Sequence, residues 1–233
     1  VTKVLDPAGG SYFIESLTAD YVKAAWALFL EIEQAGGLEA YGIDAKIEDV
    51  YNARLKEVET RKHSLIGTNI YANPVDEIPT TENAQFANVK RIAASFEDLR
   101  TSFAQAELKA VVLTFGQLKN YKPRADFVQG FFATAGIVAD QTEGFQTIEE
   151  AKAWIATADY DYVVVAATDD DTKQLIPALL EGKKQGLVLD AAGKYKEEAD
   201  AWTANGLNGF IFAGQNIVQK LNDVVTRVKE VQQ

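Results

Sequence analysis

In AVVLTFGQLKNYKPRADFVQGFF, residues 110–132, an apolar run leads through a polar loop into a helical pattern, as at a strand-to-helix connection. Two further runs, YVVVAA (162–167) and LVLD (187–190), are almost continuously apolar. Such runs are typical of strands that are buried on both faces of a parallel sheet. The sequence therefore predicts five strands: Ala110–Phe115, Ile137–Asp140, Tyr162–Ala167, Gly186–Asp190 and Gly209–Phe212.

Helical patterns alternate with these strands. The expected helices are Ala125–Ala135, Thr147–Thr157, Thr172–Glu181, Tyr195–Asn205 and Val218–Val231. This alternation is typical of an α/β protein with a doubly wound parallel sheet. We therefore predict a flavodoxin-like, Rossmann-like domain with a five-stranded parallel sheet over residues 107–233.

Residues 1–106 have a different organisation and predict an extended helical linker region. The apolar spacing predicts three helices: Ala19–Gln34 with Thr18 as its N-cap, a second from Asp44 to Arg61, and a third over Ala84–Gln105. The segment from Ile66 to Glu82 has no periodicity, and a connection of this length is unusual inside one compact domain. We expect it to be extended and largely exposed, with one of the three helices packed against the α/β domain.

The composition excludes several classes of function. The chain has 34 acidic and 23 basic residues, and its net charge of −11 disfavours nucleic acid and anionic membranes as partners. It has no cysteine, which excludes disulfides and thiol chemistry. It shows no apolar stretch of about 18 residues and no signal peptide, so we expect a cytoplasmic protein. The absence of methionine indicates a fragment, or a sequence in which modified methionines are not written.

Ligands of doubly wound domains bind at the carboxyl ends of the strands, and one such end carries the acidic cluster Asp169–Asp171. These residues would form a divalent metal site or phosphoacceptor, or they would cap a helix. Capping is favoured, because a phosphoacceptor site also needs acids after the first strand and a lysine after the fifth. Leu118, Gly214 and Gln215 occupy those places. The single histidine, His63, has no evident second ligand or nucleophile beside it, and we interpret it as a surface or core residue.

Several motifs in order along the chain carry a family resemblance. They are DPAGGSYFIESLT (6–18), FLEIEQAGGLEAY (29–41), SLIGTNIYANP (64–74), KRIAASFEDLRTSF (90–103), VVLTFGQLK (111–119), FFATAGI (131–137) and GFQTIEEA (144–151). Together they resemble the carboxyl-terminal half of methylmalonyl-CoA mutases, and they look most like the small, non-catalytic subunit of heterodimeric bacterial enzymes. The resemblance covers essentially the whole chain.

The resemblance implies a layout. An amino-terminal (β/α)8 barrel binds the acyl-CoA, a helical linker wraps the barrel, and a flavodoxin-like domain holds adenosylcobalamin. The motif DPAGGSYF corresponds to the end of that barrel, so residues 1–106 would be the linker region after a missing barrel. Residues 107–233 would be the cobalamin-binding-like domain. We expect Tyr12, Phe13 and Tyr71, which would meet the barrel or a partner in the intact subunit, to lie at the surface or in a dimer contact.

The resemblance also locates the cofactor positions. Cobalamin-binding members have Asp-x-His-x-x-Gly after the first strand, where the histidine binds cobalt and the aspartate orients it. Here Leu118, Asn120 and Pro123 stand at those places. Two further motifs, Ser-Ser-Leu and Gly-Gly, are replaced by Ala166, Ala167 and Thr168 and by Asp190 and Ala191. We therefore expect no cofactor-binding, catalytic or metal site in this chain.

The expected function is that of a structural subunit segment of the isomerase that interconverts methylmalonyl-CoA and succinyl-CoA in propionate metabolism. Its partners would be its own missing barrel and a large catalytic subunit, and adenosylcobalamin would be bound in that large subunit. The alternative is a flavodoxin-like module that senses another small molecule in the altered pocket. Catalysis by a metal at Asp169–Asp171 is a third interpretation, below both.

Overall fold

The computed structural model describes residues 3–77 and 89–232 and divides the chain into two compact units, Val1–Ala53 and Arg54–Gln233. The first unit contains helix α1 (Tyr12–Ala35), the short helix α2 (Leu38–Tyr41) and the beginning of helix α3 (Ile43–Glu59). None of the described helices is long and apolar enough to cross a membrane. The predicted division of the chain between residues 106 and 107 stays a prediction.

Helix α1 begins earlier than the sequence analysis expected. Thr18 was expected to be its N-cap, but the helix starts at Tyr12, directly after the extended residue Ser11. The reason is that residues 12–18 contain no glycine or proline that would interrupt helical hydrogen bonding. The helix ends at Gly36 as expected, in the left-handed conformation (φ 94°) that glycine adopts without strain.

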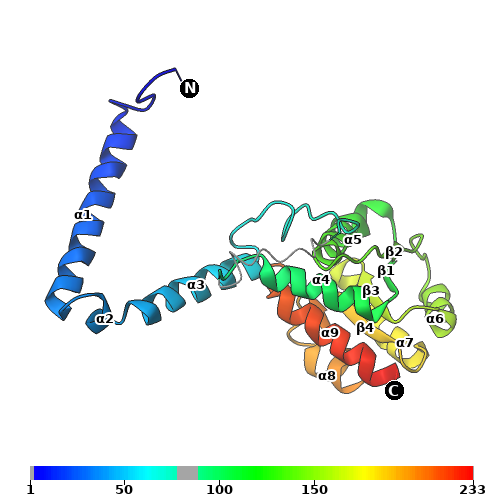
Figure 1. The fold of residues 1–233 in the computed structure, drawn as a ribbon. Coiled ribbons are helices and arrows are strands. Elements are labelled where there is room, and N and C mark those ends of the chain that lie inside the picture. The colour runs from blue at the N-terminus through cyan, green and yellow to red at the C-terminus, as the bar shows by residue number, and fades with distance from the viewer. Residues whose placement is uncertain (1–2, 78–88, 233) are drawn as a thin grey trace. The chain divides into compact units, whose positions relative to one another are not determined.

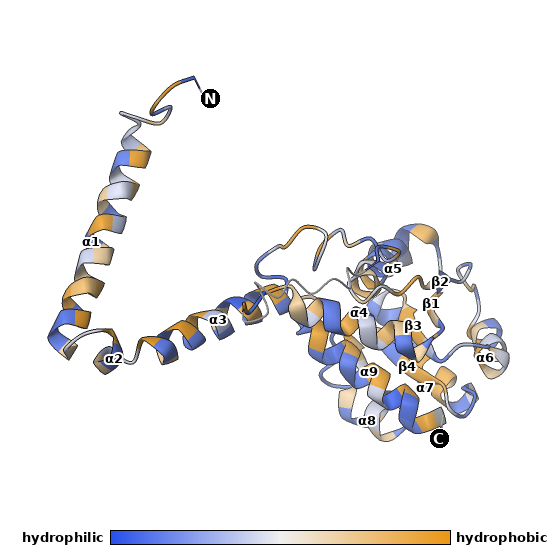
Figure 2. Cartoon of the chain, viewed as in Figure 1, coloured by the Kyte–Doolittle hydropathy of each residue, from blue (hydrophilic) through white to orange (hydrophobic). Residues whose placement is uncertain are grey.

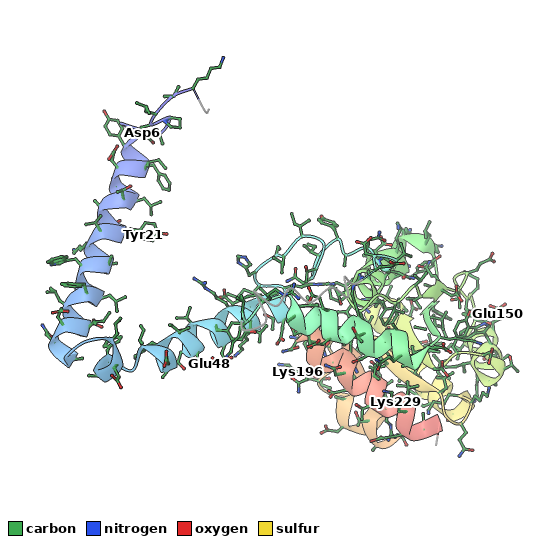
Figure 3. All side chains as sticks on the ribbon, in the orientation of Figure 1. Asp6, Tyr21, Glu48, Glu150, Lys196 and Lys229 are labelled. Carbon is green, nitrogen blue, oxygen red and sulfur yellow. The ribbon has the colours of Figure 1, made fainter. Side chains whose placement is uncertain are left out.

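The first unit exposes apolar side chains along α1. This helix has no buried residue, and Tyr12 and Phe13 are 92% and 73% exposed, as the sequence analysis predicted. Figure 2 shows apolar positions at many levels of α1, and Figure 3 shows Tyr21 projecting from it. The apolar side chains of α1 are therefore not packed into a hydrophobic core within the first unit.

The second unit contains a five-stranded parallel sheet with strand order β2-β1-β3-β4-β5. The strands are β1 (Ala110–Thr114), β2 (Asp140–Gln141), β3 (Tyr162–Ala166), β4 (Val188–Ala192) and β5 (Gly209–Ile211). This is the flavodoxin-like order, so the predicted fold is confirmed. In the register of the central strands, Val111 lies opposite Val163, and Val163 lies opposite Leu189.

Two strands lie elsewhere than predicted. Strand β2 was expected at Ile137–Asp140, but Ile137 is buried in the turn after helix α5, where its N–H donates to the carbonyl of Phe132. Strand β4 was expected to end at Asp190, yet it continues to Ala192. The charged residue does not end the strand, because Lys220 pairs with it inside the protein.

Helices cover both faces of the sheet (Figure 1). One layer contains α4 (Ala94–Ala106), α5 (Leu118–Ala133) and α9 (Ile217–Gln232), and the other contains α6 (Ile148–Thr157), α7 (Asp169–Gly182) and α8 (Ala199–Ala204). Helix α4 buries Phe96, Leu99 and Phe103 beside α9, so the predicted packing of one linker helix against the α/β domain is confirmed.

Helix boundaries differ from the prediction in several places. Helix α5 begins at Leu118 instead of Ala125, and α7 begins at Asp169 instead of Thr172. Helix α4 begins at Ala94, since residues 89–93 are not helical; residues 84–88 of the expected helix lie outside the described residues. Helix α8 is shorter than expected, because Tyr195 is buried in the loop before it.

The segment after α3 is a compact loop and is not simply extended. Residues 66–77 form no helix or named strand and are mostly exposed, as predicted, with Tyr71 83% exposed. However, Asn69 is fully buried and organises the loop: its side chain accepts from the N–H of Leu65 (2.8 Å) and donates to the carbonyls of Val58 (2.7 Å) and His63 (2.9 Å). Residues 78–82 of the predicted segment lie outside the described residues.

Two arginines fasten this loop to the carboxyl end of α5. Arg61 donates to the carbonyls of Asn69 and Gly130, both at 2.6 Å. Arg100 donates to the carbonyls of Asn73 (2.6 Å), Asp76 (2.9 Å), Ala133 (3.0 Å) and Thr134 (3.3 Å). The last carbonyls of a helix lack partners within the helix, and the helix dipole favours cations there.

Candidate functional site

The positions that the resemblance assigns to the three cofactor motifs are called the vestigial motifs here, and the first of them lies directly after β1. Leu118, Asn120 and Pro123 were predicted to lie in a loop. This is wrong, because they lie in the first two turns of α5. Leu118 is 60% exposed, and the N–H of Asn120 donates to the carbonyl of Gln117 (2.8 Å). The chain passes from strand to helix within three residues, 115–117, so positions that were expected in a loop lie in a helix.

The connection after β1 packs closely against the connection after β2. The N–H of Gly116 donates to the carbonyl of Phe145 (2.8 Å). A Cβ atom at Gly144 would lie 2.6 Å from the carbonyl oxygen of Gly116 and 2.6 Å from the ring of Tyr121. Only glycine fits at position 144, and the two connections leave no room between them for a ligand at that point.

The second vestigial motif lies at the end of β3. Ala166 is the last residue of that strand, Ala167 is buried, and Thr168 is the N-cap of α7. The Thr168 hydroxyl oxygen accepts from the N–H of Asp171 (3.2 Å). All three positions therefore belong to the end of β3 or to the start of α7.

Arg124 spans the strand ends and holds these elements together. Its Nη1 donates to the carbonyl of Ala167 (2.6 Å) and to the Tyr195 hydroxyl (2.8 Å), and its Nη2 donates to Asp169 (2.5 Å). The hydrogen bond from Arg124 lowers the pKa of Asp169, while burial raises the pKa of Tyr195. We call Arg124, Asp169 and Tyr195 the arginine clasp; it joins α5, α7 and the loop after β4.

The acidic cluster Asp169–Asp171 lies in the first turn of α7, where carboxylates favour the helix dipole. Asp169 pairs with Arg124, and Asp171 accepts from the Thr168 hydroxyl (2.6 Å). This geometry agrees with the capping interpretation. In the part of the chain that the structure describes, no group of three or more His, Cys, Asp or Glu side chains is arranged to hold a metal ion.

The third vestigial motif takes part in a buried ion pair. Asp190 is 0% exposed in the middle of β4, and its carboxylate lies 2.6 Å from Nζ of Lys220 on α9. The same carboxylate accepts from the Tyr162 hydroxyl (2.5 Å) and from the Asn208 amide (3.2 Å). Burial, followed by the charge of Asp190, raises the pKa of Tyr162 well above its ordinary value. The neighbouring Ala191 packs into the core on the opposite face of the sheet.

Close packing extends through this part of the sheet. A Cβ atom at Gly209 would lie 3.0 Å from Nζ of Lys220. A Cβ atom at Gly193 would lie 2.8 Å from the ring of Tyr195. The interior beside Asp190 is therefore filled by protein atoms.

The cofactor implied by the resemblance does not fit these residues. A lower cobalt ligand would have to be an imidazole, but the chain's one histidine, His63, follows α3 and lines a separate cavity of about 450 Å³ with Arg54 and Leu65. At the strand ends Asn120 is part of a helix, Arg124 occupies the space above β3, and Asp190 is bound to Lys220.

Four residues of this region were missed in the sequence analysis. Arg124, Tyr195, Arg61 and Lys220 belong to no motif. Lys220 alone left a signal: it lies on the apolar side of α9, and an aspartate interrupts the apolar strand β4. A buried cation is tolerated only with a buried anion, so this pattern could have predicted the pair.

The comparisons with known proteins agree with the resemblance to small subunits. Residues 1–151 match the family model described as methylmalonyl-CoA mutase. The methylmalonyl-CoA mutase small subunit of Porphyromonas gingivalis is 31% identical, covering 94% of this chain, and the probable small subunit of Mycobacterium tuberculosis is 30% identical, covering 98%. The P. gingivalis large subunit is 28% identical over 83% of this chain and 29% of its own length. This chain spans 38% of the length of those small subunits.

Proposed function

The chain belongs to the methylmalonyl-CoA mutase family, and on that premise we propose that it is a segment of a small, non-catalytic subunit. The whole enzyme would be a cytoplasmic heterodimer of propionate metabolism that interconverts methylmalonyl-CoA and succinyl-CoA. When bound, adenosylcobalamin supplies the radical chemistry, and it would be bound in a large subunit. The role of this segment would be to pack against the barrel and the partner.

The observation that supports this proposal is the construction of the strand ends. In place of a cofactor loop, α5 begins within three residues of β1, and the arginine clasp spans β3. In place of a nucleotide cavity, Asp190 and Lys220 form a buried ion pair. These side chains occupy the places that a cofactor would need, which supports the proposal that the chain supplies no reacting group to the isomerisation.

The existence of both kinds of subunit in one organism supports a paired enzyme. P. gingivalis has a protein named the small subunit and another named the large subunit, and this chain is similar to both. The exposed aromatic residues of α1, including Tyr12 and Phe13, are suitable for contacts with the remainder of a longer subunit or with the large subunit.

Titration with hydroxocobalamin and adenosylcobalamin, followed by visible absorbance, tests the absence of cofactor binding. We expect no saturable spectral shift at micromolar protein. We also expect Asn120→His to leave this result unchanged, since Leu118 and Pro123 cannot orient an imidazole and Asp190 still fills the interior. A stoichiometric spectral change with the unmodified chain would overturn the proposal.

Co-expression with a large subunit tests the partnership. A family member that carries an intact Asp-x-His-x-x-Gly motif is produced together with this chain, which has an affinity tag. We expect the large subunit to be retained with the tagged chain, and bound cobalamin to equal the amount of large subunit alone. Cobalamin in proportion to both chains would contradict a non-catalytic role.

The alternative of a sensing module in the altered pocket gains no support at the ends of β1, β3 and β4. The space that such a ligand would need above β3 is spanned by Arg124, and Tyr195 is buried below it. The filling there is partly ionic and not solidly apolar, because Arg124 pairs with Asp169.

A further inference from the structure

A separate cavity of about 480 Å³ lies beside the carboxyl end of β5. It is bounded by the connection from β5 to α9, by α5 and by the turn after α3. Phe127 and Phe131 of α5, whose ring centroids are 6.3 Å apart, and Phe212 line its apolar part. Its volume is in the range of about 300–1,000 Å³ that small-molecule sites occupy.

The charge of this cavity is opposite to that of the chain. The chain carries a net charge of −11, yet the lining includes Arg61 and Lys62 and no aspartate or glutamate. Lys62 pairs with Glu57 outside the cavity lining (2.6 Å), whereas no described carboxylate pairs with Arg61. An acidic protein thus presents a cationic, aromatic hollow beside the carboxyl end of β5.

Arg61 is held in place for binding. Its carbon Cζ lies 5.7 Å from the ring centroids of both Phe127 and Phe131. Its Nε and Nη2 donate to the carbonyls of Asn69 and Gly130, and within residues 3–77 and 89–232 its Nη1 has no hydrogen-bond partner. A partly buried guanidinium without a counter-ion, whose orientation is fixed by two carbonyls, is preorganised for an anion.

We propose that this cavity binds a small organic anion with an aromatic or branched apolar body. The carboxylate or phosphate of the ligand accepts from Nη1 of Arg61, and the apolar body packs against Phe127, Phe131 and Phe212. The site shares no residue with the vestigial cofactor positions. A test of this site therefore does not depend on whether the proposed structural role is correct.

The test uses 2-naphthoate as the anionic probe and its neutral isostere 2-naphthamide. Binding is followed residue by residue in amide nuclear magnetic resonance spectra of the full chain. We expect saturable shifts at Gly214, Gln215 and the Arg61 Nε–H with naphthoate, and binding of the amide at least about tenfold weaker, because it forms no charge-assisted hydrogen bond. Equal affinities for the two probes, or no saturable shift at these residues, would overturn the proposal.

Two variants locate the site. Ala213→Trp fills the cavity from its exposed rim and removes no hydrogen-bonding side chain, so it should abolish the shifts; the matched Ala153→Trp on the exposed side of α6 should retain them. Arg61→Gln should weaken naphthoate about tenfold and leave naphthamide unchanged. Arg61 also fastens the loop after α3, so its replacement could weaken binding by disturbing the fold. Ala213→Trp is therefore the decisive variant. If it binds naphthoate as well as the unmodified chain does, the anion binds elsewhere and the proposal is wrong.

Discussion

Asp190 and Lys220 form an ion pair inside the domain, with side chains 0% and 8% exposed. Removing one partner of a buried pair leaves the other charge without compensation. We therefore predict that Lys220→Met lowers the free energy of unfolding by about 3–5 kcal/mol. Urea unfolding followed by circular dichroism measures this change, and Lys152→Met, which removes an exposed pair with Glu181, should have a far smaller effect.

The double variant Asp190→Asn with Lys220→Met separates the two contributions. Asparagine still accepts from the Tyr162 hydroxyl but carries no charge, so no unpaired ion is left inside the protein. We expect the double variant to recover more than half of the stability that Lys220→Met loses. No recovery would show that packing around Lys220, and not its charge, is what stabilises this region.

The arginine clasp predicts a pH dependence. The hydrogen bond from Arg124 holds the pKa of Asp169 below its ordinary value of about 3.9. A carboxylate with a depressed pKa in the folded state stabilises the fold above the unfolded pKa, and this contribution is lost as the pH falls through the folded pKa. In a carboxyl-carbon resonance titration, Arg124→Gln should raise the pKa of Asp169 towards its ordinary value. An unchanged pKa would contradict the clasp.

Single residues also mark where prediction from sequence failed. Asp190 was interpreted as the end of a strand, because an aspartate in an apolar run usually faces solvent; its partner Lys220 is 30 positions away in sequence order. Arg124 was missed because its partners are distant in sequence: two lie at the junction of β3 and α7, and the third lies in the loop after β4. Contacts of this kind depend on tertiary packing, which local sequence patterns do not report.

The start of helix α5 determines whether the first vestigial motif lies in a loop or in a helix. Its start was predicted seven residues too late, since Gln117 is a weak N-cap and Pro123 is a typical helix breaker. In the second turn, however, proline removes only the hydrogen bond that residue 123 would donate to the carbonyl of Lys119. The periodic parts of the helices and central strands were predicted, because apolar spacing reports them directly.

The carboxyl end of α5 depends on Arg100, which donates to carbonyls of that helix and of the loop after α3. Lysine keeps the charge but has no planar fork that reaches several carbonyls at once. Arg100→Lys should therefore lower the free energy of unfolding by about 1–3 kcal/mol in urea. The matched Arg227→Lys on α9, which alters an exposed ion pair with Glu230, should change little. Equal effects would contradict the fastening role of Arg100.

For the whole chain, the order of the motifs along the sequence predicted the fold and the family better than any single motif did. The alternation of apolar strands and helices predicted the flavodoxin-like sheet, and the ordered motifs predicted the family. The division into units at Ala53 and Arg54 was not predicted, because it falls inside a continuous helical pattern in α3. Helical periodicity shows that a helix forms, but it does not show which surface covers the apolar side.

The two units should differ in local stability, because among residues 3–77 and 89–232 the buried apolar clusters belong to the second unit. Helix α1 has no buried residue, and helices without tertiary packing are marginal in water. We predict that amides of Ala19–Leu30 exchange with deuterium far faster than those of Tyr162–Ala166 in β3. Mass spectrometry after timed exchange measures this difference, and adding a large subunit should slow exchange in α1 while leaving β3 unchanged. Strong protection of α1 in the isolated, monomeric chain would contradict the proposal that its apolar residues contact a partner, because it would show that α1 already packs against another part of the same chain.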